Sequence, residues 1–202
     1  MEKMTKRKLQ AIASRKHILS TAMELAVDKG FTQVSIQDIC QKAGVSTGAF
    51  YHYFKSKEEV VLAWYEGSDA RYREEIIPNL MARQDMSAEE KVIKYLFEMA
   101  SYAEEVGVAT ITQLYRAQLG VDNTSFIYGE RALPEGLLNL ISEGQEKGEF
   151  RRDIQAEEVK EELLIIMRGS ILHWCQCRGN YALLERAPQT VKRYLSSIKA
   201  VK

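Results

Sequence analysis

The residues best suited to recognition chemistry share one side of a short predicted helix that follows Ser46. This side presents two hydroxyl groups, an imidazole, an ammonium group and one residue without a side chain, from Thr47, Gly48, Tyr51, His52 and Lys55. It carries no carboxylate. Because the base edges and phosphates of DNA repel acidic groups and require donors, such a face suits a helix that enters the major groove. Gly48 would also let the backbone approach a base or a phosphate closely.

Two helices and a tight turn are predicted to hold this face in position. Ser35 and Asp38 form a capping-box pattern at the start of the first helix. Its apolar side consists of residues at helical spacing, namely Ile36, Ile39, Cys40 and Ala43. Gly44 follows where a left-handed cap favours glycine, and Ser46 can cap the second helix. The stretch therefore predicts a helix-turn-helix, whose second helix has an apolar side of Ala49, Phe50, Tyr53 and Phe54.

Further helices are predicted on both sides of this motif. A helix over residues 14–29 with a wide apolar stripe precedes it, after a basic arm at residues 1–13. Another capping-box pattern, from Ser56 to Glu59, starts a helix that we expect to end at about residue 77, before Pro78. Lys57 lies in the first turn of that helix, where its ammonium group and free backbone N–H groups could hold a phosphate.

The run AGVSTGAFYHYFKSKE, from Ala43 to Glu58, resembles the signature of the TetR-type (tetracycline-repressor-like) transcriptional regulators. The resemblance covers roughly residues 10–60; beyond them only the length and the helical layout are similar. It implies an all-α homodimer, in which an N-terminal three-helix helix-turn-helix domain precedes a helical-bundle domain for ligand binding and dimerisation. It also implies double-stranded operator DNA as a partner. A helix-turn-helix that serves only packing or protein contact is the alternative.

The resemblance and the exposed face together give a predicted set of DNA contacts. We expect base contacts from Thr47 and His52, and a phosphate contact from Tyr51, whose rigid ring ends in one hydroxyl group. The resemblance makes Thr32 a further phosphate contact, although a hydroxyl that only stabilises a local turn is an equal alternative. The predicted DNA-binding residues are Thr32, Ser46, Thr47, Gly48, Tyr51, His52 and Lys57.

The distribution of charge supports a nucleic-acid partner although the chain of 202 residues has a net charge of zero. Residues 1–57 hold 10 Lys and Arg against 4 Asp and Glu, whereas the remaining residues hold 18 against 24. A basic N-terminal part joined to an acidic body is typical of a DNA-reading domain attached to a regulatory one. We therefore expect a helix-turn-helix domain at residues 1–57, linked through a helix at 58–77, and a ligand-binding and dimerisation domain at 58–202.

The C-terminal part predicts a helical bundle. A capping-box pattern at Ser87 starts one helix, and others follow over residues 108–119, to about residue 148, over 156–178 and over 184–198. The helix over 156–178 is apolar nearly all round, which predicts burial on several sides. The last helix has a regular apolar repeat. Such a helix pair suggests a four-helix interface across a two-fold axis, with a monomeric bundle core as the alternative.

Adaptable and aromatic side chains within residues 80–178 predict a pocket for a small, largely apolar or aromatic effector that weakens DNA binding. Polar groups for that pocket could come from Gln113, Arg116, Arg168 or His173. The alternative is a packed core, of which a stripe of methionine and aromatic side chains is usually a part. The predicted ligand-binding residues are Phe97, Tyr102, Tyr115, Arg116, Phe126, Met167, Arg168 and Trp174.

Other functional classes find little support in the sequence. It contains no phosphate-binding or dinucleotide-binding loop, no HExxH or CxxC motif and no nucleophile elbow, so we expect no enzyme, cofactor or metal site. The charged N-terminus and short apolar runs predict a cytoplasmic protein without a membrane partner. Two alternatives remain for regulation: a constitutive DNA-binding protein without an inducer, and a redox sensor that uses Cys175 or Cys177. A helical-bundle enzyme is a third.

Overall fold

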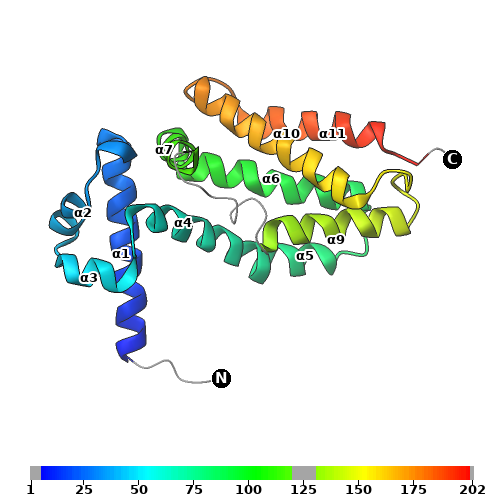
Figure 1. The fold of residues 1–202 in the computed structure, drawn as a ribbon. Coiled ribbons are helices and arrows are strands. Elements are labelled where there is room, and N and C mark those ends of the chain that lie inside the picture. Colours follow the sequence, from blue (N-terminus) through cyan, green and yellow to red (C-terminus); the bar gives the residue numbers. More distant parts are fainter. Residues whose placement is uncertain (1–5, 120–130, 201–202) are drawn as a thin grey trace. The chain divides into compact units, whose positions relative to one another are not determined.

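The computed structural model describes residues 6–119 and 131–200, which form helices joined by turns (Figure 1). These residues include no β-strand, and one isolated bridge pairs Phe150 with Lys199. The all-α fold is therefore confirmed. The described residues group into two compact units. The first unit comprises those of 1–66 and 112–127, and the second comprises those of 67–111 and 128–202. The functional boundary at residue 57 stays a prediction.

The first unit contains the helix-turn-helix. Its elements are α1 (Lys6–Lys29), the 3₁₀ helix η1 (Phe31–Gln33), α2 (Ile36–Ala43), α3 (Thr47–Tyr53) and the start of α4 (Lys57–Arg71). Helix α1 packs against η1 and α2, and α2 packs against α3. Their shared core is formed by fully buried apolar side chains, among them Ile18, Ile39, Phe50, Phe54 and Val60.

The predicted caps around α2 are confirmed. The Ser35 hydroxyl accepts a hydrogen bond from the Asp38 N–H at 3.1 Å, and the Asp38 carboxylate accepts one from the Ser35 N–H at 2.9 Å. These bonds, together with Lys29 at 3.2 Å, lower the pKa of Asp38 to about 2. Gly44 closes α2 in the left-handed region, with φ +65°. The Ser46 hydroxyl caps α3 through the Ala49 N–H at 3.1 Å.

Two helix starts differ from the expectation. Helix α1 begins at Lys6 rather than at residue 14, because residues 6–13 are good helix formers even though their exposed turns lack an apolar stripe. At α4 the Glu59 N–H donates to the Ser56 hydroxyl at 3.3 Å, as predicted. The Glu59 carboxylate, however, accepts from the Lys55 N–H instead of closing the capping box on Ser56.

The second unit is a bundle of helices that lie side by side (Figure 1). Helices α6 (Ala88–Val106), α9 (Ala132–Glu146), α10 (Ala156–Gln176) and α11 (Leu183–Ser197) make its main contacts: α11 packs against α6 and α10, and α9 packs against α6 and α10. Gly144, inside α9, is explained by this packing, since a Cβ there would come within 2.3 Å of the Phe150 ring. Helix α7 (Val108–Leu119) starts after Gly107, as expected, and like α4 it contributes residues to both units.

The helix that begins at Lys57 does not stop before Pro78. It continues through a π-helical turn, η2 (Tyr72–Ile76), into α5 (Ile77–Met81). In this turn the Ile77 N–H donates to the Tyr72 carbonyl, five residues back. A proline removes one N–H and crowds the preceding turn, and the wider π turn accommodates it without ending the helix. The expected end at about residue 77 was therefore wrong.

Candidate DNA interface and effector region

The polar face of α3 lies at the surface of the first unit. Thr47, Gly48, Tyr51 and His52 are all exposed, whereas Phe50 on the opposite side is fully buried. Tyr51 retains 53% of its accessible surface although its ring packs edge-on against Phe50 at 5.6 Å between centroids. The structure thus orients the predicted donor groups outward, on a helix anchored by its apolar side. Their contacts with DNA stay a prediction.

The other predicted DNA contacts fall into two groups. Thr32 is exposed in η1, and Ser46 is exposed at the N-cap of α3. Lys57 is half-buried, and its ammonium group donates to the carbonyls of Phe31 at 2.9 Å and Val34 at 3.0 Å. The same group lies 4.7 Å from the centroid of the Phe31 ring. Sequence reasoning missed this internal role. Lys57 stays in the predicted DNA-binding set through its backbone N–H at the start of α4.

The predicted effector residues are distributed over both units. In the second unit Met167 and Trp174 are buried, and Phe97, Tyr102 and Arg168 are half-buried. The Trp174 indole donates to the Tyr181 carbonyl at 3.2 Å, so its polar group is already used. In the first unit Tyr115 is half-buried and Arg116 is exposed. Phe126 lies outside the described residues. A common pocket for this set stays a prediction.

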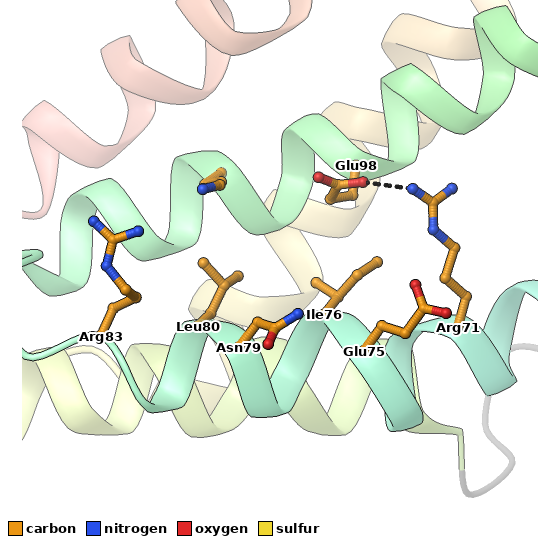
Figure 2. Close-up of a pocket in the computed structure, with 8 residues that line it drawn as sticks. Arg71, Glu75, Ile76, Asn79, Leu80, Arg83 and Glu98 are labelled. Carbon is orange, nitrogen blue, oxygen red and sulfur yellow. Dashed lines mark hydrogen bonds and ion pairs between the residues drawn. The ribbon is translucent and has the colours of Figure 1, made fainter.

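A groove of about 440 Å³ lies along η2, α5 and α6 in the second unit (Figure 2). Ile76 and Leu80 give it a buried apolar floor. Arg71 reaches Glu98 across the groove at 3.1 Å, as Figure 2 shows. The remaining lining residues are Glu75, Asn79, Arg83 and Lys94. Sequence reasoning missed this groove because it depends on the helix continuing past Pro78, and no local motif signals a π turn.

Helix α10 leaves an apolar face uncovered within the protomer. Ile165 retains 65% of its surface and Leu172 retains 36%. A second groove, of about 330 Å³, follows this face between α10 and α11, with Ser170 and Tyr181 among its lining residues. The repeat of α11 does not contribute to this face: Ala187, Val191 and Leu195 are buried within the protomer. The expectation that this repeat faces a partner was therefore wrong.

The cysteines differ in exposure. Cys40 and Cys175 are buried, and the half-buried Cys177 sulfur lies 3.6 Å from His173 Nε2. His173 itself, one of the polar groups suggested for the effector pocket, is exposed. Among the described residues no group of His, Cys, Asp and Glu side chains could hold a metal ion, and no helix is long and apolar enough to cross a membrane.

Comparison with known proteins identifies the family. The model of the bacterial regulatory proteins of the tetR family matches residues 18–64. The transcriptional repressor KstR2 of Rhodococcus jostii is 30% identical over 154 residues, which cover 71% of each protein. The chain belongs to the TetR family. The fatty acid metabolism regulator protein of Bacillus subtilis is 22% identical over 186 residues, covering 90% of this chain and 93% of that protein.

Solved TetR-family structures share the fold. Bacillus subtilis FadR in complex with stearoyl-CoA has a TM-score of 0.75 at 19% identity, covering 91% of this chain and 98% of the other. Thermus thermophilus FadR in complex with lauroyl-CoA has a TM-score of 0.70 at 25% identity, covering 93% and 96%. As a member of the TetR family, the protein is a DNA-binding transcriptional regulator. Membership implies a regulatory rather than a catalytic role.

Gly48→Ala tests how closely α3 approaches DNA. A Cβ at Gly48 would meet only the Ser46 hydroxyl, at 3.9 Å, so the substitution fits the free protein. We expect the free energy of unfolding to stay level or rise by up to about 1 kcal/mol, because alanine favours a helix over glycine. Operator affinity should fall at least about tenfold, equivalent to about 1.4 kcal/mol, because the new methyl group separates the backbone from DNA.

The control for this variant is Gly67→Ala. Gly67 lies in α4, and a Cβ there meets nothing within 4 Å. It should gain similar stability with unchanged operator affinity. Fluorescence anisotropy with a labelled operator and urea unfolding measure the two effects. An operator affinity of Gly48→Ala equal to that of Gly67→Ala would show that the α3 backbone is not close to DNA.

Lys57→Met separates the two roles of Lys57. Losing two charge-assisted hydrogen bonds and a cation–π contact should lower the free energy of unfolding by about 2–4 kcal/mol. Because the ammonium group is engaged inside the protein, we expect the salt dependence of operator binding to keep its slope below the unfolding temperature. A direct phosphate contact would instead reduce the slope by about 1. Lys55→Met, at the exposed neighbouring lysine, is the control and should leave stability unchanged.

Proposed function

We propose that the protein is a homodimeric repressor that reads a pseudo-palindromic operator with α3 and is released from it by an acyl-CoA thioester. The proposal that α3 recognises the operator is supported above all by its exposed face, which has no carboxylate. Thr47 and His52 are assigned to base edges and Tyr51 to a phosphate. Thr32, Ser46, Gly48 and the backbone at Lys57 support them. Operator binding would place the protein in the cytoplasm with the DNA.

The uncovered face of α10 supports a two-fold dimer. Ile165, Gly169 and Leu172 follow one another at helical spacing, and all three are exposed. A contiguous exposed apolar face of this kind is typical of an interaction surface. In a two-fold dimer the same face of the second copy would cover it. The two helix-turn-helix domains of the dimer, here called reading heads, would then contact half-sites on one side of the DNA. These half-sites would lie about 34–36 Å apart or somewhat more.

The relatives suggest the class of effector. The names of two similar structures record stearoyl-CoA and lauroyl-CoA as ligands of FadR proteins. Such a molecule joins a long apolar chain to a phosphorylated head. The predicted aromatic and methionine side chains suit the chain. The groove of Figure 2 suits the head, since its lining includes Arg71, Arg83 and Lys94 against two carboxylates. Among the described residues Lys94 is exposed and in no ion pair, so it can meet a phosphate.

The effector need not touch DNA to release it. It must bind better to an arrangement of the dimer in which the reading heads do not fit the operator. Lowering operator affinity about 100-fold requires a coupling free energy of about 2.7 kcal/mol. By thermodynamic linkage the operator must weaken effector binding by the same factor.

The test combines selection and titration. An operator is first selected from random duplexes with the purified protein. Its release is then followed by anisotropy during titration with lauroyl-CoA or stearoyl-CoA, below their micelle-forming concentrations. Free CoA and lauric acid are the controls. We expect release by the thioesters only, and a weaker lauroyl-CoA response in Lys94→Gln. Failure of all acyl-CoA esters to shift operator affinity would reject the effector class and leave DNA binding intact.

A further inference from the structure

Gln113 has a different contact from the one that the sequence suggests. It lies in α7 with only 9% of its surface exposed, and its amide oxygen accepts a hydrogen bond from the Phe31 N–H at 3.1 Å. Both residues belong to the first unit. The side chain that the sequence suggested for an effector pocket is therefore hydrogen-bonded to the backbone of the helix-turn-helix domain.

The position of Phe31 makes this bond informative. Phe31 is the first residue of η1, directly after Gly30, whose φ of +84° ends α1. The first N–H groups of a helix have no partner within it, so they need an acceptor from elsewhere. Gln113 supplies that acceptor, while Lys57 of α4 binds the Phe31 carbonyl at 2.9 Å. Side chains of α7 and α4 thus hold both backbone polar groups of this one residue.

A short, capped segment joins Phe31 to α3. Val34 connects η1 to the Ser35 cap of α2, and the turn at Gly44 connects α2 to α3. Val34, Ile39 and Phe50 along this segment lie in one buried core, so we expect the segment to move as one body. A displacement of η1 therefore displaces the face that carries Thr47 and Tyr51. Helix α7 also contributes Val108–Ile111 to the second unit, so it extends from the bundle to this bond.

We propose that Gln113 is a positioning residue, which holds the α3 face in its operator-binding arrangement and loses this hold when the effector displaces α7. A displacement of about 1 Å is enough, because a hydrogen bond of 3.1 Å is broken beyond about 3.6 Å or when it loses its alignment. The effector-dependent part rests on the proposed function. The positioning part concerns the free protein and is independent of it.

Two variants separate positioning from packing. Gln113→Leu fills the site without an acceptor, and Gln113→Glu keeps an acceptor oxygen at the same reach. Without effector, we expect Gln113→Leu to bind the selected operator about tenfold more weakly than the wild type and to lose amide-exchange protection at Phe31. Gln113→Glu should restore both. Gln118→Leu, five positions along α7, is the control and should match the wild type, since Gln118 contacts the Tyr65 side chain at 3.5 Å rather than η1.

Titration with lauroyl-CoA then tests whether the effector breaks the bond between Gln113 and Phe31. In the wild type we expect it to lower operator affinity about 100-fold and to reduce protection of the Phe31 amide. In Gln113→Leu the loss of affinity should shrink to about tenfold, because that variant already lacks the bond. For the same reason its lauroyl-CoA affinity without DNA should rise by up to about tenfold. Urea unfolding identifies any variant that fails to fold. If Gln113→Leu does not fold, Gln113→Met, which also lacks the acceptor oxygen, takes its place. Equal operator affinity and Phe31 exchange in folded Gln113→Leu and wild type would overturn the proposal. If lauroyl-CoA has no effect on the wild type, only the effector class fails.

Discussion

Ile165→Glu on α10 is expected to convert the dimer into monomers and to remove high-affinity operator binding. Ile165 has 65% of its surface exposed, so a glutamate there has little effect inside one protomer. In a two-fold interface the same position occurs twice, and each copy would bury a charge in place of an apolar contact. Truncating one central interface residue lowers the binding free energy by about 2–4 kcal/mol. Because the substitution occurs twice in the dimer, we expect the free energy of dimerisation to fall by about 4–8 kcal/mol.

Sedimentation velocity at micromolar concentration measures the first effect, and anisotropy with the full and the half operator measures the second. Binding to a half operator should change little, because α3 is intact. Met81→Glu is the control: Met81 is 39% exposed on α5, away from the face of α10. Ile165→Glu that remains a dimer would exclude this face as the interface. Val191 and Leu195 are unsuitable for this test, because a charge at either fully buried position would disrupt the protomer itself.

The helix-turn-helix could be predicted because its signals are local. The capping box at Ser35, the left-handed turn at Gly44 and the cap at Ser46 depend on side chains within three residues of the backbone that they satisfy. The period of apolar residues also decides which side of α3 is exposed. Sequence alone therefore gave the orientation of Thr47 and Tyr51, and the structure confirms that both are exposed.

The features that the sequence did not reveal depend on distant partners. The Lys57 ammonium group finds two carbonyls more than twenty positions earlier in the chain, and Gln113 finds the Phe31 N–H, so neither pairing leaves a local pattern. The repeat of α11 correctly predicted a buried stripe, but periodicity cannot tell whether its own chain or a partner covers that stripe. The helix through Pro78 needed a π turn, which no local motif signals and whose residues pack against the distant helix α9.

Asp69 shows how the second unit holds the far end of α4. Asp69 retains 7% of its accessible surface. Its carboxylate accepts hydrogen bonds from the N–H groups of Ala132 at 3.0 Å and Leu133 at 3.2 Å. These are the first two residues of α9, whose own N-cap, Arg131, provides no side-chain cap. Arg131 instead lies 3.5 Å from the same carboxylate. Asp69 is therefore an N-cap supplied by another helix, with a favourable charge at the positive end of α9.

Asp69→Leu is expected to lower the free energy of unfolding by about 3–5 kcal/mol, because it leaves the N–H groups of Ala132 and Leu133 without their acceptor and removes one ion-pair partner of the largely buried Arg131. The more exposed Arg73 should contribute little of this loss. Asp69→Asn keeps one acceptor oxygen and should lose less. Urea unfolding measures both. Glu98→Gln is the control, since it weakens the partly exposed pair with Arg71 and should cost about 1 kcal/mol or less. If Asp69→Leu costs no more than Glu98→Gln, the carboxylate does not hold α9, and the link between α4 and the bundle must depend on the packing of Tyr72 against Tyr95 instead.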